Sequence, residues 1–269
     1  MKARLMAMSI LIMLIFIFQF DVQEIEAQTY AYILPNHSGY VNDHGYYYIV
    51  GEIENNGSFP ITGVTVNETY YNVVVNATYY DSTGTIIGYT YGNMFLDVLL
   101  PGRKAPFEII LYSATKSEKV HNYTLSLICT AAKPKPLGLE IVNNSYFIDE
   151  SGFHVVGEIK NVGSDYTSYV RVIVTFYNAS GYVIAARSSY TSPLHLYPEE
   201  IATFELILNA SIATKVDHYA LEAESMQYAL VPEINSVNFL LTLILTAHLI
   251  GISILKAKKN KCVSVVFNS

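Results

Sequence analysis

The histidines of this 269-residue chain are the side chains best suited to bind a metal or to move a proton near neutral pH. Six of the seven lie between the two apolar ends of the sequence: His37, His44, His121, His154, His195 and His218. No two of these six have the short spacing of a zinc or copper site. The sequence also contains neither a Gly-x-Ser-x-Gly nucleophile motif nor a phosphate-binding loop. We therefore predict no catalytic, cofactor-binding or metal-binding residue, and no cofactor.

Carboxylates are the other candidates for chemistry. Glu52 and Glu158 recur 106 positions apart in similar surroundings, so they could be read as a carboxylate pair. We interpret each instead as an outward-facing residue on a strand of a separate module. Asp43 and the pair 149–150 lie in turn-like stretches, but they lack the dense spacing of oxygen ligands that a calcium loop shows.

A third chemical signal is the number of Asn-x-Ser/Thr sequons, which are acceptors of N-linked glycans. Eight of the 18 asparagines stand in such sequons: Asn36, Asn56, Asn67, Asn76, Asn122, Asn143, Asn178 and Asn209. All eight lie between the two apolar ends. Asn, Ser and Thr are also turn formers and co-occur in loops for that reason. The sequons predict an N-glycosylated surface, with co-occurrence in turns as the alternative.

The N-terminus has the three parts of an export signal. Lys2 and Arg4 give a positive start, an apolar run follows from Leu5 to Phe20, and a short polar stretch ends at the small residue Ala27. We predict a signal peptide over residues 1–27. The alternative is a permanent membrane helix, for which the apolar run is short because a full span needs about 20 residues.

The C-terminus carries a second apolar run, Val237 to Leu255, long enough to cross a bilayer as a helix. Four lysines follow within residues 256–261, and basic residues stay on the cytoplasmic side. We predict a single-pass protein of the cell membrane, with the ectodomain outside and a basic tail, residues 256–269, in the cytoplasm. Cys129 and Cys262 would lie on opposite sides and could not pair.

The composition of residues 28–232 limits the partners of the predicted ectodomain. It has 10 Lys and Arg against 19 Asp and Glu, a net charge of −9. This argues against binding of nucleic acid or of anionic lipid, both of which need clustered positive charge. The whole chain has 23 tyrosines and no tryptophan. Tyr, Val, Ile and Thr dominate, and these residues favour strands.

The ectodomain sequence repeats itself in order. The matched stretches, first copy before second, are 50–58 and 156–164, 78–84 and 175–181, and 122–125 and 218–221, with Pro101 and Phe107 matched by Pro198 and Phe204. Such internal similarity indicates two homologous domains. We expect them at 28–132 and 137–232, joined by a stiff polar linker, Lys-Pro-Lys-Pro, at 133–136.

Strict alternation within each copy predicts half-buried strands. Val170, Val172, Val174 and Phe176 point one way, while the residues between them, from Arg171 to Tyr177, point the other. Turn-like compositions at 81–84 and 178–181 separate the strands. The fold class we predict is all-β, with two tandem immunoglobulin-like β-sandwich domains, an N-terminal signal peptide and one C-terminal transmembrane helix.

The order Gly-x-Ile-x-Asn, then aromatic-Tyr-Asp/Asn-x-x-Gly, then Leu-x-Pro and Phe, resembles the FxLYD domain over residues 40–128 and 146–226. The Tyr of the naming motif is kept as Tyr80 and Tyr177, and its Asp as Asp81. The motif departs elsewhere: Ala77 and Val174 replace Phe, Tyr79 and Phe176 replace Leu, Asn178 replaces the second Asp, and Pro-Glu at 198–199 replaces Pro-Gly. The resemblance implies a small β-sandwich of bacterial and archaeal surface proteins, without catalytic or cofactor residues.

The stretch Val-Pro-Glu-Ile at 231–234, ahead of the apolar run and the lysines, is similar to PEF-type sorting signals of archaeal sortase-like systems. Those signals usually have Phe where this chain has Ile234, and they end soon after the basic cluster. Here eight residues follow Lys261. Plain retention of the membrane helix is the alternative to cleavage.

These observations predict a non-catalytic, membrane-anchored cell-surface glycoprotein whose modules serve structural or adhesive contacts with other surface proteins or glycans. The alternative is an extracellular binding subunit of a transporter, sensor or secretion complex. Tyrosine clusters at 46–48 and 70–71 could form a binding surface, or could pack within and between the sheets. An enzyme is the third reading.

Overall fold

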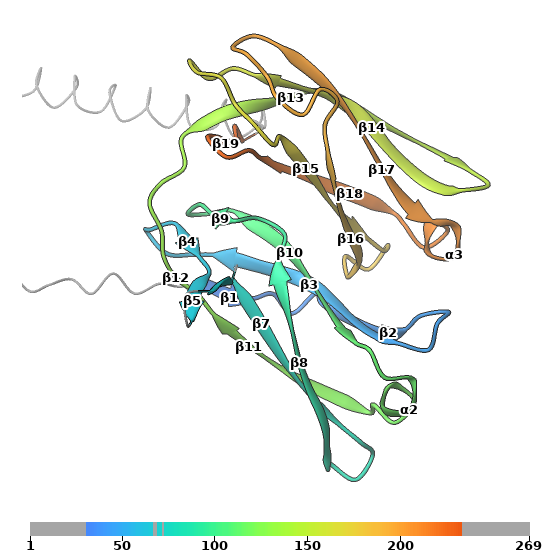
Figure 1. The fold of residues 1–269 in the computed structure, drawn as a ribbon. Helices are drawn as coiled ribbons and strands as arrows, with labels where there is room; N and C mark the ends of the chain where they lie inside the picture. Colours follow the sequence, from blue (N-terminus) through green and yellow to red (C-terminus); the bar gives the residue numbers. More distant parts are fainter. Residues whose placement is uncertain (1–30, 67–68, 72, 233–269) are drawn as a thin grey trace, which may run out of the picture.

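A computed structural model describes residues 31–66, 69–71 and 73–232, and this part of the chain is all-β, as predicted (Figure 1). The predicted signal peptide, transmembrane helix and cytoplasmic tail lie outside the described residues. Among the helices that are described, none has the length and apolar character needed to cross a membrane.

The first module, as we call residues 31–132, is built on one seven-stranded sheet with the order β1-β3-β10-β8-β7-β11, to which β2 adds by pairing with β3. Its strands are β1 (Ala31–Ile33), β2 (Ser38–Val41), β3 (Tyr47–Asn55), β7 (Val74–Tyr80), β8 (Ile86–Met94), β10 (Lys104–Leu111) and β11 (Asn122–Ile128). Smaller pairings involve β4 (Ile61–Thr62), β9 (Val98–Leu99) and β12 (Thr130–Ala131), and separately β5 (Val64–Val66) and β6 (Thr69–Tyr71). A short helix, α2 (Ala114–Ser117), precedes β11.

The second module, residues 137–232, has a seven-stranded sheet of order β16-β15-β18-β19-β13-β14-β17. Its elements are β13 (Leu137–Asp149), β14 (Gly152–Asn161), β15 (Arg171–Tyr177), β16 (Val183–Tyr190), β17 (Ile201–Asn209), α3 (Ala210–Ala213), β18 (His218–Glu224) and β19 (Ala229–Leu230). The short β19 pairs in parallel with β13 and antiparallel with β18, and so connects the two halves of the sheet. Each module folds its sheet over a core in a sandwich or barrel-like arrangement.

Matched residues of the two copies form matched turns. Asp81 accepts backbone N–H groups from the residues two and four positions on, and Asn178 does the same in the second copy. Gly84 (φ +83°) and Gly181 (φ +77°) then adopt the left-handed conformation that glycine tolerates best. Because both Asp and Asn offer a side-chain oxygen, the departure from the motif at Asn178 leaves the turn unchanged.

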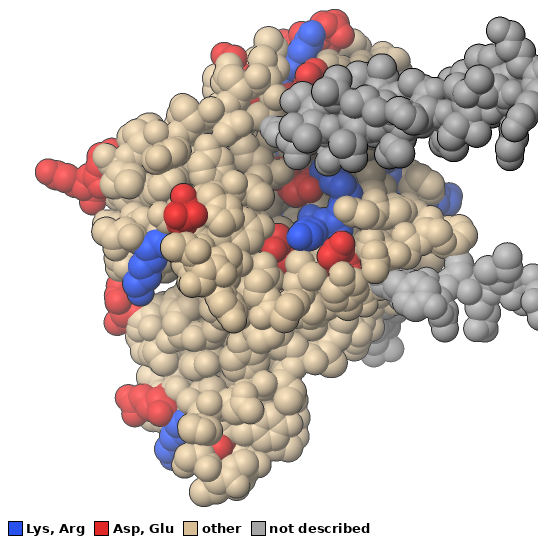
Figure 2. Space-filling model, turned by 180° about the vertical axis from the view of Figure 1, so that it is seen from behind, with Lys and Arg blue, Asp and Glu red and all other residues tan. Residues whose placement is uncertain are grey.

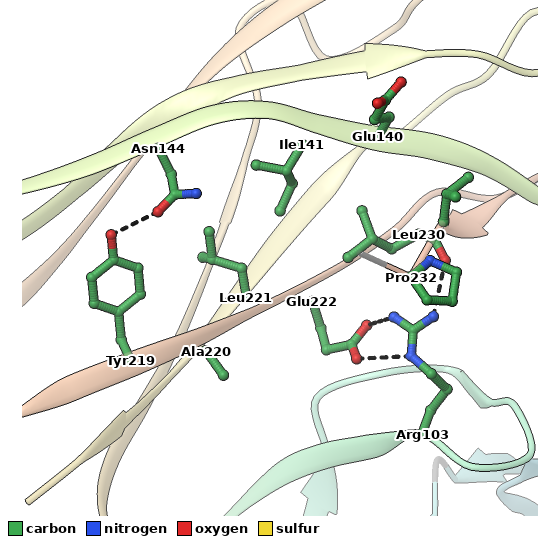
Figure 3. A pocket seen from close by; sticks show the side chains of 11 residues that line it. Arg103, Glu140, Ile141, Asn144, Tyr219, Ala220, Leu221, Glu222, Leu230 and Pro232 are labelled. Carbon is green, nitrogen blue, oxygen red and sulfur yellow. Dashed lines mark hydrogen bonds and ion pairs between the residues drawn. The ribbon is translucent and has the colours of Figure 1, made fainter. Parts of the chain in front are cut away.

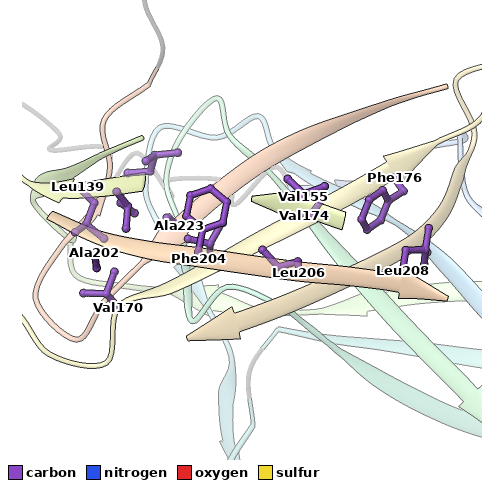
Figure 4. Packing of buried hydrophobic residues seen from close by; sticks show 14 of the residues in the cluster. Leu139, Val155, Val170, Val174, Phe176, Ala202, Phe204, Leu206, Leu208 and Ala223 are labelled. Carbon is purple, nitrogen blue, oxygen red and sulfur yellow. The ribbon is translucent and has the colours of Figure 1, made fainter. Parts of the chain in front are cut away.

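The repeat predicts that the matched aromatic pairs Phe107/Phe204 and Tyr79/Phe176 point into the two cores, and this is confirmed. Phe107 is fully buried in the first module and Phe204 is 4% exposed in the second, while Tyr79 and Phe176 are both fully buried. Figure 4 shows Phe204 and Phe176 among the aliphatic side chains of the second core, which come from strands on both sides of the sandwich. Area burial on this scale is the main force available to a domain without disulfides.

The expectation that β15 is buried on one face only is wrong. Its inward residues are buried as predicted, but Ile173, Thr175 and Tyr177 on the opposite face are buried as well. The reason is that the first module covers this face. Ile173 packs in the core cluster of the first module, and Tyr177 packs with Val50 and Val183 in a small cluster that joins the modules.

The two modules therefore lie sheet against sheet rather than end to end (Figure 1). Strands β3 and β10 of the first module contact β16 of the second. The connection between the modules is held at both sides, since the Ala132 N–H donates to Pro60 O and the Ala229 N–H donates to Pro136 O. We call the surface where the modules meet the joint.

Candidate functional site

One end of the joint is organised around Glu52, a buried carboxylate on β3. Its Oε1 accepts the Tyr177 hydroxyl at 2.6 Å, and its Oε2 accepts the Asn36 amide at 3.0 Å. The Glu52 side chain points away from the core of its own module, as expected. It is nevertheless only 4% exposed, because the second module covers it. Burial, together with the bond to Glu52, raises the pKa of Tyr177, so its hydroxyl stays a donor at all physiological pH values.

Backbone contacts reinforce this end. The Val183 N–H donates to Asn36 O at 2.8 Å, and the Ser38 hydroxyl donates to Val183 O. The Asn36 amide also approaches Gly181 O at 3.4 Å. The loop before β2 is thereby bonded to the hairpin that precedes β16.

The other end of the joint is ionic. The guanidinium of Arg103 donates to both carboxylate oxygens of Glu222 and, at 3.0 Å, to the carbonyl of Leu230. Such two-pronged contact is the strongest form of Arg–carboxylate pairing. Burial raises the pKa of Glu222, and the neighbouring Arg103 opposes that shift.

Glu224, which is 3% exposed, is the centre of a second ionic group at this end. Its Oε1 accepts Arg171 Nη2 at 2.6 Å and the Asp97 N–H at 2.9 Å, and its Oε2 accepts Lys135 Nζ at 3.0 Å. In Figure 2 basic and acidic side chains lie next to one another in the hollow between the modules. Removing one partner of such a group would leave a buried charge uncompensated, which is strongly destabilising.

A groove with a volume of about 700 Å³ opens beside the joint, between β13 and β18. The short β19 pairs with both strands at one end of the groove, along Leu137–Leu139 of β13 and at Glu224 of β18. Figure 3 shows Tyr219 and Asn144 bonded at one end of the groove, with Arg103 and Glu222 at the other. Ile141 and Leu221 give the groove an apolar middle. A groove of this kind, between unpaired strand edges, suits an extended peptide better than a compact small molecule.

The strongest resemblance to a catalytic arrangement lies at the β13–β14 hairpin. His154 Nδ1 is 2.7 Å from Glu205 Oε1, and its Nε2 is 2.6 Å from the Ser151 hydroxyl and 3.1 Å from Asp149 Oδ1. Glu205 and Asp149 raise the pKa of this imidazole. An imidazolium held between two carboxylates has no lone pair with which to activate a serine. Ser151 also donates to Asp149 at 2.7 Å, so the cluster ties the hairpin together.

Sequence reasoning missed this cluster because Glu205 lies 51 residues beyond His154. The available signal was that both residues stand at outward-facing positions of strands in which buried and exposed residues alternate. Glu158, unlike Glu52, is only half-buried and accepts the Asn143 amide at 2.6 Å. Within the described ranges, no group of three His, Cys, Asp or Glu residues could hold a metal ion. Cys129 is a half-buried free thiol whose pKa is raised by burial.

The predicted glycan acceptors differ in their surroundings. Exposed positions are Asn56, Asn122, Asn143 and Asn209, and half-buried ones are Asn36, Asn76 and Asn178. Asn67 lies outside the described residues. Asn36 differs from the others because both hydrogen bonds of its amide nitrogen lie within the joint.

The tyrosines at 46–48 do not form one surface. Tyr47 packs against the first core, while Tyr48 stacks on Tyr40 at 5.6 Å and Tyr46 contacts Tyr112 at 5.5 Å. The side chains at 70–71 lie outside those that the structure describes. The second module has another group of exposed tyrosines, in which Tyr166 and Tyr169 contact His195. Tyr197 contacts Tyr166, and Tyr190 contacts Tyr169.

No family model and no curated protein matches this chain. Solved structures that share some resemblance include β-glucuronidase 2 of Bacteroides uniformis bound to cyclophellitol-6-carboxylate aziridine, at 11% identity and a TM-score of 0.25, over 69% of this chain and 25% of that one. A β-glucuronidase from glycoside hydrolase family 2 has 9% identity and a TM-score of 0.26, over 69% and 23%. A calcium-binding mutant of the B. uniformis enzyme has 12% identity and a TM-score of 0.24, over 73% of this chain and 27% of that one. This chain spans about a quarter of the length of those structures, and scores this low carry no argument about its function.

Proposed function

We propose that this chain is a non-catalytic, membrane-anchored cell-surface glycoprotein whose two immunoglobulin-like sandwiches act as one stiff body in structural or adhesive contacts. The observation that carries the proposal is the joint. Buried bonds from Tyr177 to Glu52 and from the Asp97 N–H to Glu224 join the modules at two separated places, and Ile173, between Arg171 and Tyr177 on β15, packs into the core cluster of the first module. A flexible tether would leave these groups exposed and solvated. Buried partners of this kind favour a single arrangement of the modules.

Export and anchoring support the surface assignment from the sequence. The charged start and apolar run of residues 1–27 have the form of a signal peptide, and the lysines after Leu255 favour a cytoplasmic tail. The resemblance to FxLYD modules and the sequons agree with an outer surface. The groove beside β18 is the observation that favours the second reading, an extracellular binding subunit that takes an extended segment of a partner.

The surface assignment is tested with the full chain carrying a C-terminal tag in its host. Protease added to intact cells should destroy the modules and leave a small tagged fragment that contains residues 256–269. If a sortase-like enzyme cuts near Pro232, the tag will be missing from the mature protein. Modules protected in intact cells, yet cleaved after lysis, would refute the assignment.

The mechanical part of the proposal is tested by loosening the joint. The double variant Arg103→Ala/Tyr177→Phe removes one bond at each end of the joint, and Lys160→Ala removes an ion pair with Glu199 that lies within the second module. Because buried carboxylates lose their partners, we expect the double variant to reach the surface in smaller amounts, to expand in small-angle scattering and to weaken cell attachment per molecule at the surface. Lys160→Ala should leave all three unchanged. Attachment that survives an expanded joint would contradict a role for stiffness.

A further inference from the structure

A second, smaller cleft opens where the aromatic loops of the second module meet the ionic end of the joint. It has a volume of about 250 Å³. The residues that line it are Asp97 from the first module and Tyr169, Arg171, Tyr190, Glu224, Ser225 and Met226 from the second. This volume lies below the roughly 300–1,000 Å³ typical of pockets for drug-sized ligands, so the cleft suits a single ring-sized group.

Two tyrosines supply aromatic surface to this cleft. Tyr169 is 50% exposed and Tyr190 is 56% exposed, and their ring centroids lie 6.3 Å apart at an interplanar angle of 67°. Tyr169 also contacts His195 at 5.3 Å, which restricts its ring from the other side. Partly exposed rings held by neighbours offer a rigid binding surface at low entropic cost.

Tyr169 adopts a backbone conformation that bulky residues seldom take. Its φ is +55°, in the left-handed region, where a side chain larger than glycine costs free energy. Core packing does not account for this cost, since half of the side chain is exposed. Strain of this kind at an exposed aromatic residue is characteristic of binding sites.

The polar side of the cleft is charge-balanced and held in place. Arg171 uses Nη2 for its contacts with Phe95 O, Asp97 and Glu224, at 2.7, 3.5 and 2.6 Å. Its Nε and Nη1 make no hydrogen bond with any residue in the described part of the chain. Lys135 balances the second negative charge from the far side of Glu224. A site with matched charges does not select an ion, but it offers oriented hydrogen bonds to a neutral polar ligand.

We propose that this cleft binds one pyranose ring of a neutral glycan. A pyranose presents C–H groups on its faces and hydroxyl groups around its edge. The faces can pack on Tyr190 and Tyr169, and the edge can bond to Arg171 and Asp97. The inference deepens the adhesive function proposed above, because it names the class of ligand at the surface of one module.

Binding is measured on the detergent-solubilised full chain by titration with methyl glycosides of glucose, galactose, mannose and N-acetylglucosamine, and with neutral polysaccharides built from them. Tyrosine fluorescence and ligand-observed NMR report binding, since the chain has no tryptophan. A single ring of about a dozen non-hydrogen atoms should bind with a millimolar Kd. Tyr190→Ala should weaken binding at least tenfold. Tyr112→Ala, which removes a 72% exposed ring of the first module, is the matched control and should not change it.

Tyr169→Gly separates binding from folding. Glycine accepts φ +55° without strain, which offsets the lost ring contacts, so this variant should remain folded and unfold near the temperature of the parent while losing the sugar. No saturable binding of any of these sugars, binding unaffected by both tyrosine variants, or binding of a proline-rich peptide at the cleft in place of a sugar would each overturn the proposal. Because the titration is done in solution, its failure is separate from failure of the surface assignment, which the protease experiment reports.

Discussion

Asn55 and Asn161 occupy the same position in the two modules and make the same three hydrogen bonds. Both are fully buried at the end of the Gly-x-Ile-x-Asn motif. The amide nitrogen of each donates to two backbone oxygens, those of Phe59 (2.8 Å) and Leu99 (2.9 Å) for Asn55 and those of Asp165 (2.9 Å) and Leu196 (3.1 Å) for Asn161. The side-chain oxygen accepts the N–H two residues on, from Gly57 or Gly163. The repeat thus preserves a device that fastens two loops to one strand end.

Replacing either asparagine by alanine should destabilise its module. Asn161→Ala removes all three bonds, but Leu196 O still accepts the Thr167 N–H and the Gly163 N–H still reaches Gly138 O at 3.2 Å, so the Asp165 carbonyl is the group left unpaired, at a cost of about 1–3 kcal/mol. We expect a loss of about 1–3 kcal/mol in the free energy of unfolding. Urea denaturation of unglycosylated protein measures it. The exposed neighbour Asn56→Ala is the control and should shift stability by less than about 0.5 kcal/mol.

The glycine of the same motif should be intolerant of a methyl group. Gly157 lies opposite Phe204 across β14 and β17, and a Cβ on it would lie 2.4 Å from the backbone oxygen of Asn143 and 2.6 Å from the phenyl ring. Gly157→Ala should cost about 1–3 kcal/mol from overpacking, and Phe204→Ala about 3–5 kcal/mol from the cavity. Gly88→Ala is the control, because its nearest neighbour would be 3.7 Å away. Equal stability of Gly157→Ala and Gly88→Ala would refute the packing argument.

Much of each module was predictable because local signals agree there. The inward alternation of β15 and the matched turns at 81–85 and 178–182 follow from short-range pattern. The joint was not predictable from a single sequence. Alternation along a strand shows which residues point away from its core but not what covers them. Glu52 could therefore be assigned to the outward face of β3, but its burial could not be predicted.

The candidate sites show the same division. The His154 cluster and the tyrosine cleft join residues that are distant in sequence, and the spacing rules for metal sites or nucleophile motifs cannot detect them. One local signal was available for the joint. Ile173 and Tyr177 are large residues on the outward parity of β15, and an apolar outward face is itself a sign of a covered surface.

The hairpin cluster should make stability depend on pH in two windows. Bonding to Glu205 and Asp149 raises the pKa of His154 above 6.5, so its contribution is complete below that pH and is lost as pH rises through the higher folded value. Hydrogen bonds from Ser151 lower the pKa of Asp149 from 3.8 to about 2. Its contribution is present above pH 3.8 and is lost as pH falls towards 2.

NMR titration of the histidine ring protons checks the first window. His154 should titrate above its ordinary value and His37 below its own, because burial lowers the pKa of His37. In His154→Gln, the fall in unfolding free energy above pH 6.5 should flatten. A His154 midpoint below that of His37 would contradict the assignment.

The bond between Tyr177 and Glu52 should couple the modules. Tyr177→Phe keeps the ring in the apolar cluster with Val50 but removes the donor, leaving Glu52 Oε1 unpaired in a buried site. We expect a loss of about 1.5–3 kcal/mol, the range for hydrogen bonds to charged groups. A double-mutant cycle with Glu52→Gln should give a coupling energy above about 0.5 kcal/mol. Tyr182→Phe, on the exposed turn, is the control.

The sequons should not all carry sugar, and the joint predicts which one stays bare. N-linked glycans attach to the amide nitrogen, which at Asn36 donates to Glu52 Oε2 at 3.0 Å and to Gly181 O at 3.4 Å. A glycan there would replace one of these two N–H donors and would need space within the joint, so it would push the modules apart. Asn122 and Asn209 are exposed, so their amides are accessible. Peptide mass spectrometry of protein from the native host should therefore find sugar at Asn122 and Asn209 and an unmodified Asn36.

A variant links sequon occupancy to the joint itself. In Tyr177→Phe/Val183→Glu, one bond to Glu52 is lost and a second negative charge enters the small cluster that joins the modules. Opening of the joint should then free the amide of Asn36, and its occupancy should rise while that of Asn122 stays constant. Full occupancy of Asn36 in the parent protein would mean that sugar is added before the modules meet, or that they separate on the cell surface. Unmodified asparagines at all eight positions would instead remove the glycoprotein assignment and leave the joint untouched, because the contacts at Glu52 and Glu224 are made by atoms of the polypeptide and need no sugar.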